Sequence, residues 1–279
     1  MTRKSAPLRL RVRNRLRRTL RGLSEWRETK RADVLVVSYP KCGRTWLRLL
    51  MARALQEEYR LDVLTLELEQ LTSMVPKLPR VYFTHEGEPY KQSPDELEVS
   101  KRRYARKQVI LLVRDPRDIV VSLYFHVTRR QRAFTGSLAE FVTGRRGGFD
   151  TIIAFYNNWA RQRALPKGLL LVRYEDLHRN AAGELRRVMD FLGVAVSDVS
   201  IEAAVRYATF ENMRELEKKQ HLDSYRLRPA KSDDPESFKT RRGKVGGFRD
   251  YLDAPTVADL STRLERLDPM FGYRPDGVE

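Results

Sequence analysis

The sequence contains one cysteine, Cys42, and no long hydrophobic run. A single thiol excludes an internal disulfide framework and any zinc site built from several cysteines. The longest apolar runs, such as 109–113 and 169–172, are far shorter than the roughly 20 residues of a membrane span. The N-terminal region also lacks the apolar core of a secretory signal. We therefore expect a soluble cytoplasmic protein.

Acidic residues are too few to balance the basic ones. The chain of 279 residues has 54 Lys and Arg against 37 Asp and Glu, a net charge of +17. Such an excess favours polyanionic partners: nucleic acid, an anionic membrane or a phosphate-rich cofactor. Residues 1–31 hold twelve of the basic residues and only two acidic ones. The remaining excess is much smaller, so nucleic acid is not expected as a partner of the rest of the chain.

Residues 1–31 form the first of two segments that the sequence predicts. Leu and Val recur every three or four residues from Leu8 to Leu23, which indicates an amphipathic helix with an arginine-rich face. Such a helix could lie on anionic lipid and attach the protein peripherally to a membrane. A transit peptide has a similar composition, and a helix packed on the protein by its leucine face is a further alternative. Residues 32–279 form the second segment, the main domain.

Short apolar runs alternate with amphipathic patterns through the main domain. This alternation predicts a single α/β domain with a parallel sheet flanked by helices on both faces. The polar stretch 220–247 predicts a long loop. The expected strands are 33–39, 81–84, 108–113 and 168–173, and the expected helices are 45–59, 117–128, 138–142, 151–164, 181–192, 202–207, 211–219 and 256–267.

The segment from Ser38 to Trp46 joins a predicted strand to a predicted helix. This P-loop-like strand–turn–helix offers free backbone N–H groups and the positive end of a helix to an anion. Gly43 permits close approach of the backbone, Lys41 adds a positive charge and Thr45 adds a hydroxyl. The pattern G-x-x-x-x-G-K-[ST] is absent, which argues against an ordinary nucleoside triphosphatase.

A second charged segment, Arg114 to Ser122, follows the predicted strand 108–113. Ligands of parallel α/β sheets bind at the carboxyl ends of the strands. Arg114 is suited to grip a phosphate with its planar guanidinium, and Ser122 follows about two helical turns later. Taken alone, the segment is explained better by a surface Arg–Asp pair and a helical serine.

Together these segments resemble the two cofactor motifs of the sulfotransferase family, which uses 3′-phosphoadenylyl sulfate. Residues 39–46 match the first motif, Y-P-K-[SA]-G-T-T-W, except at Cys42 and Arg44. Residues 114–122 match the second motif, R-[DN]-P-[RK]-D-x-x-x-S, throughout. Further similarities to P-R-x-x-K-T-H, Y-E-D-[LM], T-S-F-x-x-M and R-K-G-x-x-G-D-W-K lie at 79–85, 174–177, 208–213 and 241–249.

The resemblance implies the roles of the site residues. His85 would be the general base, and Lys41 would stabilise the leaving phosphate. Phe83 replaces a lysine of the family's pattern, and Arg44 is interpreted as supplying part of that charge. No metal is implied, because lysine and arginine carry the positive charge. The residues implied to bind 3′-phosphoadenylyl sulfate, or its product 3′-phosphoadenosine 5′-phosphate (PAP), are Lys41, Cys42, Gly43, Arg44, Thr45, Trp46, Arg114, Ser122, Tyr174, Thr209, Phe210, Arg241, Arg242 and Gly243.

The sequence thus predicts a sulfotransferase that moves a sulfuryl group to a hydroxyl, or an amine, of an acceptor. The acceptor could be a glycan, a lipid or a small molecule. Arginines at 129–146 favour an anionic acceptor, although a solvated loop explains them equally well. Phosphoryl transfer on a similar fold, and non-catalytic binding to an anionic membrane or nucleic acid, remain alternatives. Cys42 lies beside Lys41 at a predicted helix N-terminus, which favours a lowered thiol pKa.

Overall fold

A parallel β-sheet forms the centre of the protein. The computed structural model describes residues 22, 24–219, 227, 234–275 and 277–278. All neighbouring strands of the main sheet pair in parallel, in the order β2-β1-β3-β4. This confirms the expected α/β fold, and the four strands lie where the sequence predicts them. They are β1 (Val34–Ser38), β2 (Val81–Thr84), β3 (Gln108–Val113) and β4 (Gly168–Arg173).

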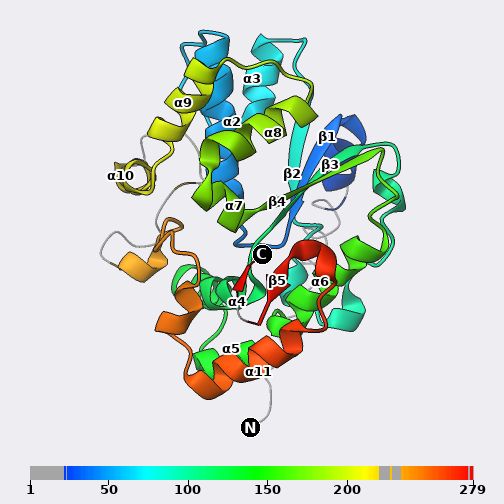
Figure 1. Cartoon of the computed structure of the whole chain (residues 1–279), viewed down its shortest axis with the longest axis vertical. Helices are drawn as coiled ribbons and strands as arrows, with labels where there is room; N and C mark the ends of the chain where they lie inside the picture. Colours follow the sequence, from blue (N-terminus) through cyan, green and yellow to red (C-terminus); the bar gives the residue numbers. More distant parts are fainter. Residues whose placement is uncertain (1–21, 23, 220–226, 228–233, 276, 279) are drawn as a thin grey trace, which may run out of the picture.

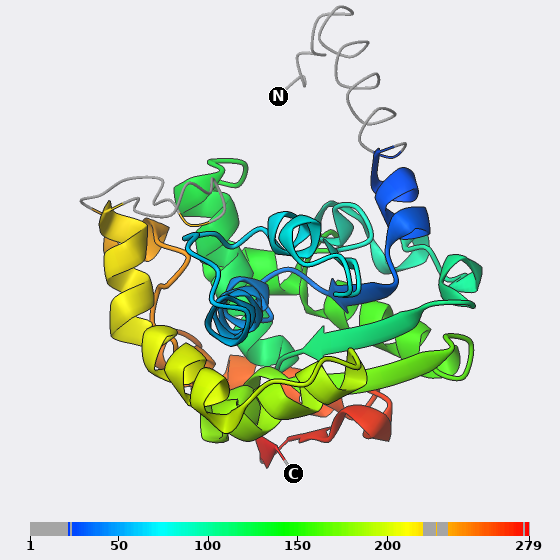
Figure 2. The same cartoon turned by 90° about the horizontal axis from the view of Figure 1, so that it is seen from above.

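Helices cover both faces of this sheet (Figure 1). One face carries α2 (Arg44–Glu58), α3 (Leu68–Met74), α8 (Ala181–Phe191) and α9 (Asp198–Tyr207). The other face carries α4 (Pro116–Phe125), α5 (Leu138–Thr143), α6 (Phe149–Arg161) and α11 (Ala254–Leu264). Two further helices are α7 (Tyr174–Arg179) and α10 (Phe210–Lys219), and α10 runs along the border of the domain (yellow in Figure 2).

Three local features differ from the sequence prediction. The helices α3 and α7 were not expected, because seven and six residues are too few for a clear helical period. The helix expected at 117–128 stops being α-helical at Phe125, and a π-helix, η4 (His126–Arg130), follows it. A small antiparallel pair, β5 (Tyr273–Arg274) and β6 (Gly277–Val278), lies near the C-terminus. Among the described residues no helix is long and apolar enough to cross a membrane.

The strand order places a ligand crevice between β1 and β3. The chain passes from β1 to β2 on one side, and β3 then pairs with β1 on the other side. At such a switch point, the loops leaving the carboxyl ends of the two strands diverge and leave a crevice. Both charged segments begin there, because residues 39–46 follow β1 and residues 114–122 follow β3.

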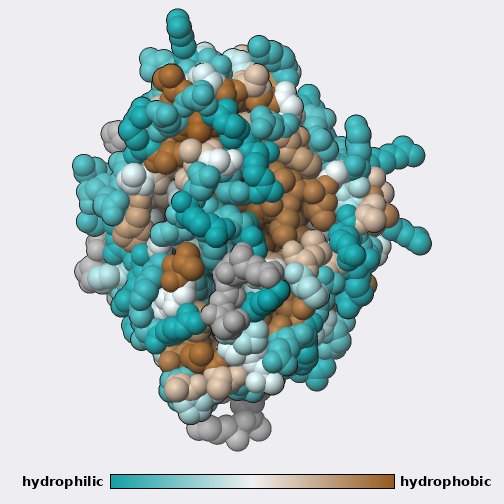
Figure 3. Space-filling model, viewed as in Figure 1, coloured by the Kyte–Doolittle hydropathy of each residue, from teal (hydrophilic) through white to brown (hydrophobic). Residues whose placement is uncertain are grey.

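The buried strands explain why the sheet is stable at its centre. Every residue of β1 is buried, and so is every residue of β3 after Gln108. The edge strand β4 is covered less completely, and Leu169 to Leu171 are only partly buried. An apolar patch is accordingly visible near β4 on the surface (Figure 3).

Only the end of the basic N-terminal segment lies within the described residues. Residues 24–31 are helical (blue in Figure 2), and the side chain of Thr29 is buried. The carboxylate of Glu25 accepts hydrogen bonds from the hydroxyl of Thr84 and from the backbone N–H of Gly87. The amphipathic helix predicted for residues 8–23, and most of the loop predicted at 220–247, lie outside the described residues.

Arg117, in the first turn of α4, is almost fully buried. Its guanidinium pairs with the buried carboxylate of Asp115 at 2.7 Å. It also donates to the backbone carbonyls of Arg274 at 3.0 Å and Pro275 at 2.7 Å. The segment that begins at Arg114 is therefore held against the C-terminal part of the chain.

We expect Arg117→Met to lower the free energy of unfolding by about 3–5 kcal/mol, because it leaves the carboxylate of Asp115 buried and unpaired. Urea denaturation measures this loss. Arg145→Met is the matched control, since Arg145 pairs with Asp95 on the surface, with 78% and 64% of the two side chains exposed, and should leave stability unchanged. A loss below about 1 kcal/mol in Arg117→Met would contradict the structural role of this pair.

Candidate functional site

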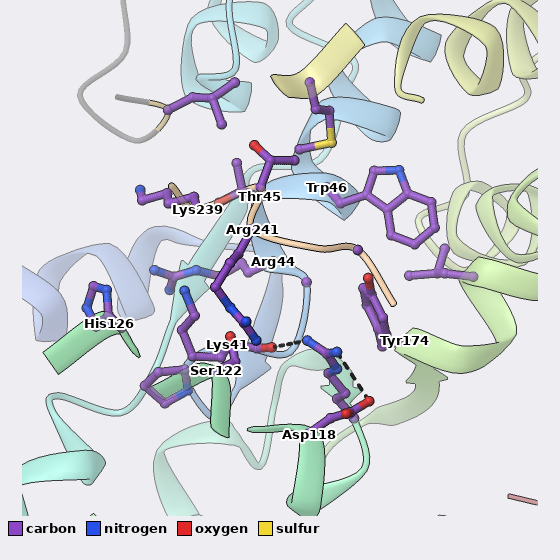
Figure 4. Close-up of a pocket in the computed structure, with 18 of the residues that line it drawn as sticks. Lys41, Arg44, Thr45, Trp46, Asp118, Ser122, His126, Tyr174, Lys239 and Arg241 are labelled. Atoms are coloured by element: carbon purple, nitrogen blue, oxygen red, sulfur yellow. Dashed lines mark hydrogen bonds and ion pairs between the residues drawn. The ribbon is translucent and has the colours of Figure 1, made fainter. Parts of the chain in front are cut away.

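A cavity of about 840 Å³ opens at the crevice between β1 and β3. All the residues that the sequence assigned to the site line it, except Cys42. Figure 4 shows Lys41, Arg44 and Arg241 extending toward a common space, with Tyr174 on the opposite side. The sequence motifs therefore meet in one place, although they are separated by up to about 200 residues in the chain.

The turn after β1 is shaped by two residues with positive φ. Lys41 has φ 77° and Gly43 has φ 90°, a region in which residues with a Cβ are rarely stable. A Cβ at Gly43 would lie 2.6 Å from the ring of Tyr174, so only glycine fits there. The turn leads into α2, and Thr45 in the first turn of this helix lines the cavity, so the positive end of the helix lies beside it.

Lys41 is placed where its ammonium group is hard to keep charged. Burial lowers its pKa to about 7, and the positive charges of Lys239, Arg130 and Arg241 lower it in the same direction. An anion in the cavity would favour the charged form. Lys41 is therefore suited to meet negative charge that arrives in, or develops within, the cavity.

His85 is held as a neutral imidazole in one tautomer. Its Nδ1 lies 2.8 Å from the backbone carbonyl of Ser38, which can only accept a hydrogen bond, so Nδ1 carries the proton. The lone pair is then on Nε2, as a general base requires. Burial lowers the pKa of His85 well below its usual value, and the charge of Arg44 adds to this effect. The loop after His85 is fixed by Glu86, which pairs with buried Lys101 at 2.7 Å.

Cys42 differs from the sequence prediction. Its side chain is fully buried, does not line the cavity, and lies with its Sγ 3.4 Å from the hydroxyl of Tyr156. Burial raises the pKa of the thiol to about 12, the reverse of the expected lowering. Only the backbone of Cys42 can therefore contribute to a phosphate-binding turn, because the thiol packs in the core.

Arg114 is oriented by a carboxylate from its own segment. Its guanidinium donates to Asp118 at 3.2 Å and to the backbone carbonyl of Lys244 at 2.9 Å, and it lies 4.3 Å from the centre of the Tyr174 ring. Asp118 also accepts from the backbone N–H groups of Gly246 and Phe248, both at 2.9 Å. One side chain thus joins the segment after β3 to residues 246–248.

Residues 241–243 form another wall of the cavity. Arg241 donates to Glu236 at 3.0 Å, and its guanidinium lies 4.4 Å from the centre of the Phe125 ring. The more exposed Arg242 pairs with Asp250 at 3.4 Å. Gly243 has φ 59°, and a Cβ there would lie 2.5 Å from the ring of Phe210.

Aromatic side chains line the end of the cavity near α7 and α10. The indole of Trp46 donates to the carbonyl of Ala208 at 2.9 Å and packs edge-on against Tyr174, with ring centres 5.6 Å apart. Phe210 and Thr209 line the cavity at the start of α10, and Ser122 lines it from α4. This end offers ring faces, and the neighbouring walls offer cations, which suits a phosphorylated nucleoside.

Sequence reasoning missed several residues that shape the site. Asp118 lay inside a recognised segment without an assigned role, and buried Glu217 of α10 holds the backbone N–H groups of Lys239 and Thr240 at 2.7 and 2.9 Å. His126, which lies in none of the recognised motifs, also lines the cavity. The only signal for Glu217 was an acidic residue on the apolar face of a helix.

A strand–turn–helix crevice, cations from several segments and an imidazole that line one cavity are typical of an α/β group transferase. Among the described residues no cluster of His, Cys, Asp and Glu could hold a metal ion.

Residues 31–265 match the model of the sulfotransferase domain family, so the chain belongs to that family. It is 24% identical to mouse sulfotransferase 1B1 over 271 residues, covering 88% of this chain and 83% of that one. It is 23% identical to rabbit amine sulfotransferase over 260 residues, covering 86% and 80%. The crystal structure of mouse sulfotransferase SULT7A1 complexed with PAP shares the fold, with a TM-score of 0.58, 22% identity and 86% of each chain covered.

We expect Cys42 in the folded protein to react with a disulfide reagent at roughly one-thousandth of the rate in the urea-unfolded chain at pH 8, because only the thiolate reacts. Release of the coloured thiol from dithiobis(nitrobenzoic acid) measures both rates. If the labelling rate of the folded protein is within tenfold of the rate of the unfolded chain, the thiol of Cys42 is not buried and protonated as described.

Proposed function

We propose that the protein transfers a sulfuryl group from 3′-phosphoadenylyl sulfate to a hydroxyl, or an amine, of an acceptor. The observation that carries the proposal is that Lys41, Arg114 and His85 line the same cavity. These residues come from the carboxyl ends of three neighbouring parallel strands, β1, β3 and β2. The family membership of the chain and the names of its relatives support the same activity.

The donor set fits a nucleotide with phosphates at both ends of its ribose. The Nε atoms of Arg114 and Arg241 are buried and have no hydrogen-bond partner among the described residues. Each could donate to a phosphate oxygen, as could the hydroxyl of Ser122. In the proposal, Arg114, Ser122 and residues 241–243 hold the 3′-phosphate, while residues 41–45 hold the 5′ end, and Trp46 and Phe210 flank the adenine.

The donor supplies a sulfuryl group already activated by its bond to the 5′-phosphate. His85 takes the proton of the acceptor hydroxyl on Nε2, while the acceptor oxygen bonds to sulfur and the bond between sulfur and the phosphate oxygen breaks. Lys41 stabilises the charge that is left on that oxygen. Both residues start in the required state, since His85 is neutral and anionic groups favour the ammonium form of Lys41.

Arg44 is the proposed substitute for the lysine that Phe83 replaces. Phe83 is buried, and the guanidinium of Arg48 lies 3.9 Å from the centre of its ring. The Arg48 side chain is itself buried and pairs with Glu67 at 3.4 Å, whereas Arg44 lines the cavity. An Arg44→Thr variant with unchanged turnover and PAP affinity would remove this role.

Arg114→Gln should weaken PAP binding by about 100-fold, because it removes the charge and most of the donors facing the 3′-phosphate. The affinity for AMP, which has no 3′-phosphate, should fall only a few-fold. Isothermal titration of the full chain with both nucleotides measures the difference.

The matched control for this cycle is Arg187→Gln. Arg187 pairs with Glu184 on α8, outside the cavity. The variant should therefore bind both nucleotides with the affinities of the unmodified protein. Equal losses of PAP and AMP affinity in Arg114→Gln would contradict the 3′-phosphate assignment. No PAP binding by the unmodified protein would overturn the proposed function.

PAP binding should take up close to one proton at pH 8. Lys41 is largely neutral there, since its pKa is about 7 in the free protein, and the bound phosphate restores its charge. Affinity should therefore fall with rising pH, approaching about tenfold per pH unit above pH 7.5. Titrations in buffers of different ionisation enthalpy count the protons.

Lys41→Arg provides the control, because arginine stays charged over this range. Proton uptake should disappear in that variant and the pH dependence should flatten. If Lys41→Arg takes up the same proton as the unmodified protein, Lys41 is not the group that titrates.

A further inference from the structure

The end of the cavity around His85 is polar. Phe83 is accompanied there by Tyr90, Glu88, Gln131 and His126, all of which line the cavity. The amide of Gln131 donates to the hydroxyl of Tyr90 at 2.9 Å, and this hydroxyl lies 3.2 Å from the carboxylate of Glu88. The hydroxyl of Tyr90 thus lies between an amide and a carboxylate.

The π-helix η4 brings two of these groups to the cavity. A π-helix bonds each residue to the one five positions later, and the backbone N–H of Gln131 indeed donates to the carbonyl of His126 at 3.0 Å. Residues five apart therefore lie near one face, whereas in an α-helix they would point to different sides. The local change of helix type explains why His126 and Gln131 both line the cavity.

His126 has an unsatisfied polar atom at this position. Its Nδ1 is buried without a hydrogen-bond partner among the described residues, and its ring packs edge-on against Tyr90, with centres 6.4 Å apart. Burial lowers the pKa of His126 to about 2, and the charges of Lys41, Arg130 and Lys239 contribute. The ring is therefore neutral, and it can offer one donor and one acceptor to a ligand. Figure 4 shows it on the same side of the cavity as Lys239.

We propose that this polar end, formed by Tyr90, His126, Gln131 and Glu88, selects a sugar hydroxyl as the sulfuryl acceptor. A site built to hydrogen-bond hydroxyls disfavours ligands that lack them, because a buried polar atom such as Nδ1 of His126 is then left unpaired. The ring of Tyr90 offers an apolar face to the C–H groups of a sugar, and the surrounding groups match its hydroxyls. A phenol or a steroid alcohol would satisfy only one of them. This inference rests on the proposed function and specifies its acceptor.

The test uses the full chain and 3′-phosphoadenylyl sulfate labelled in the sulfuryl group. The acceptors are the 4-nitrophenyl glycosides of glucose, galactose and mannose, against 4-nitrophenol and a steroid alcohol. We expect at least one glycoside to be labelled with kcat/KM about tenfold or more above both other acceptors. His126→Phe and Gln131→Leu should each raise the KM for that glycoside about tenfold. They should thereby lower the ratio of its kcat/KM to that of the other acceptors, with PAP affinity unchanged.

Gln70→Leu is the matched control, since Gln70 is exposed on α3 and does not line the cavity, and it should keep the preference. If no glycoside is labelled, or if kcat/KM is higher for the phenol or the steroid, the inference is overturned. The proposed function still stands in that case, provided that PAP binds. The inference is also overturned if both His126→Phe and Gln131→Leu keep the preference for the glycoside unchanged. If PAP fails to bind, the proposed function fails, and the inference fails with it.

Discussion

The carboxylate of Asp118 is the interaction on which the site depends. It holds the guanidinium of Arg114 and two backbone N–H groups at 246–248, so it joins segments about 130 residues apart in the chain. This fixes the direction of Arg114, and it brings Arg241 and Gly243 to the same cavity. A side chain with a single oxygen acceptor could not satisfy three donors in this way. The geometry of this wall of the cavity therefore follows from one buried carboxylate that accepts three hydrogen bonds.

The cations gathered in the cavity explain the protonation states of its other groups. Positive charge lowers the pKa of Lys41, of His85 and of His126, in each case in addition to burial. The imidazoles of His85 and His126 consequently remain neutral. The proposed roles, a general base for His85 and a hydrogen-bonding contact to the acceptor for His126, both require this state. The same positive field favours a highly charged anionic ligand, whose phosphates would restore the charge of Lys41. In the proposed function, binding and catalysis draw on one electrostatic arrangement.

The sequence predicts the sheet well because buried parallel strands leave a local signal: continuous apolar runs such as 34–37 and 109–113. It also predicts which segments form the cavity, since both main motifs follow strands whose carboxyl ends meet. The contacts of Asp118 and Glu217 could not be predicted, because their partners are distant in the chain or are backbone groups. The Cys42 side chain packs in the core within a turn in which Lys41 has a positive φ, and the exposure of His126 to the cavity depends on a π-helix. Neither has a sequence pattern that we could read.

The most direct test of the account is the rate of label transfer by His85→Asn compared with the unmodified protein, at saturating 3′-phosphoadenylyl sulfate and with PAP affinity measured in parallel. If His85 is the base in a cavity shared with Lys41 and Arg114, transfer should fall by about 100-fold or more, while PAP affinity stays the same. Transfer within a few-fold of the unmodified rate would contradict the central claim that these residues form one active site.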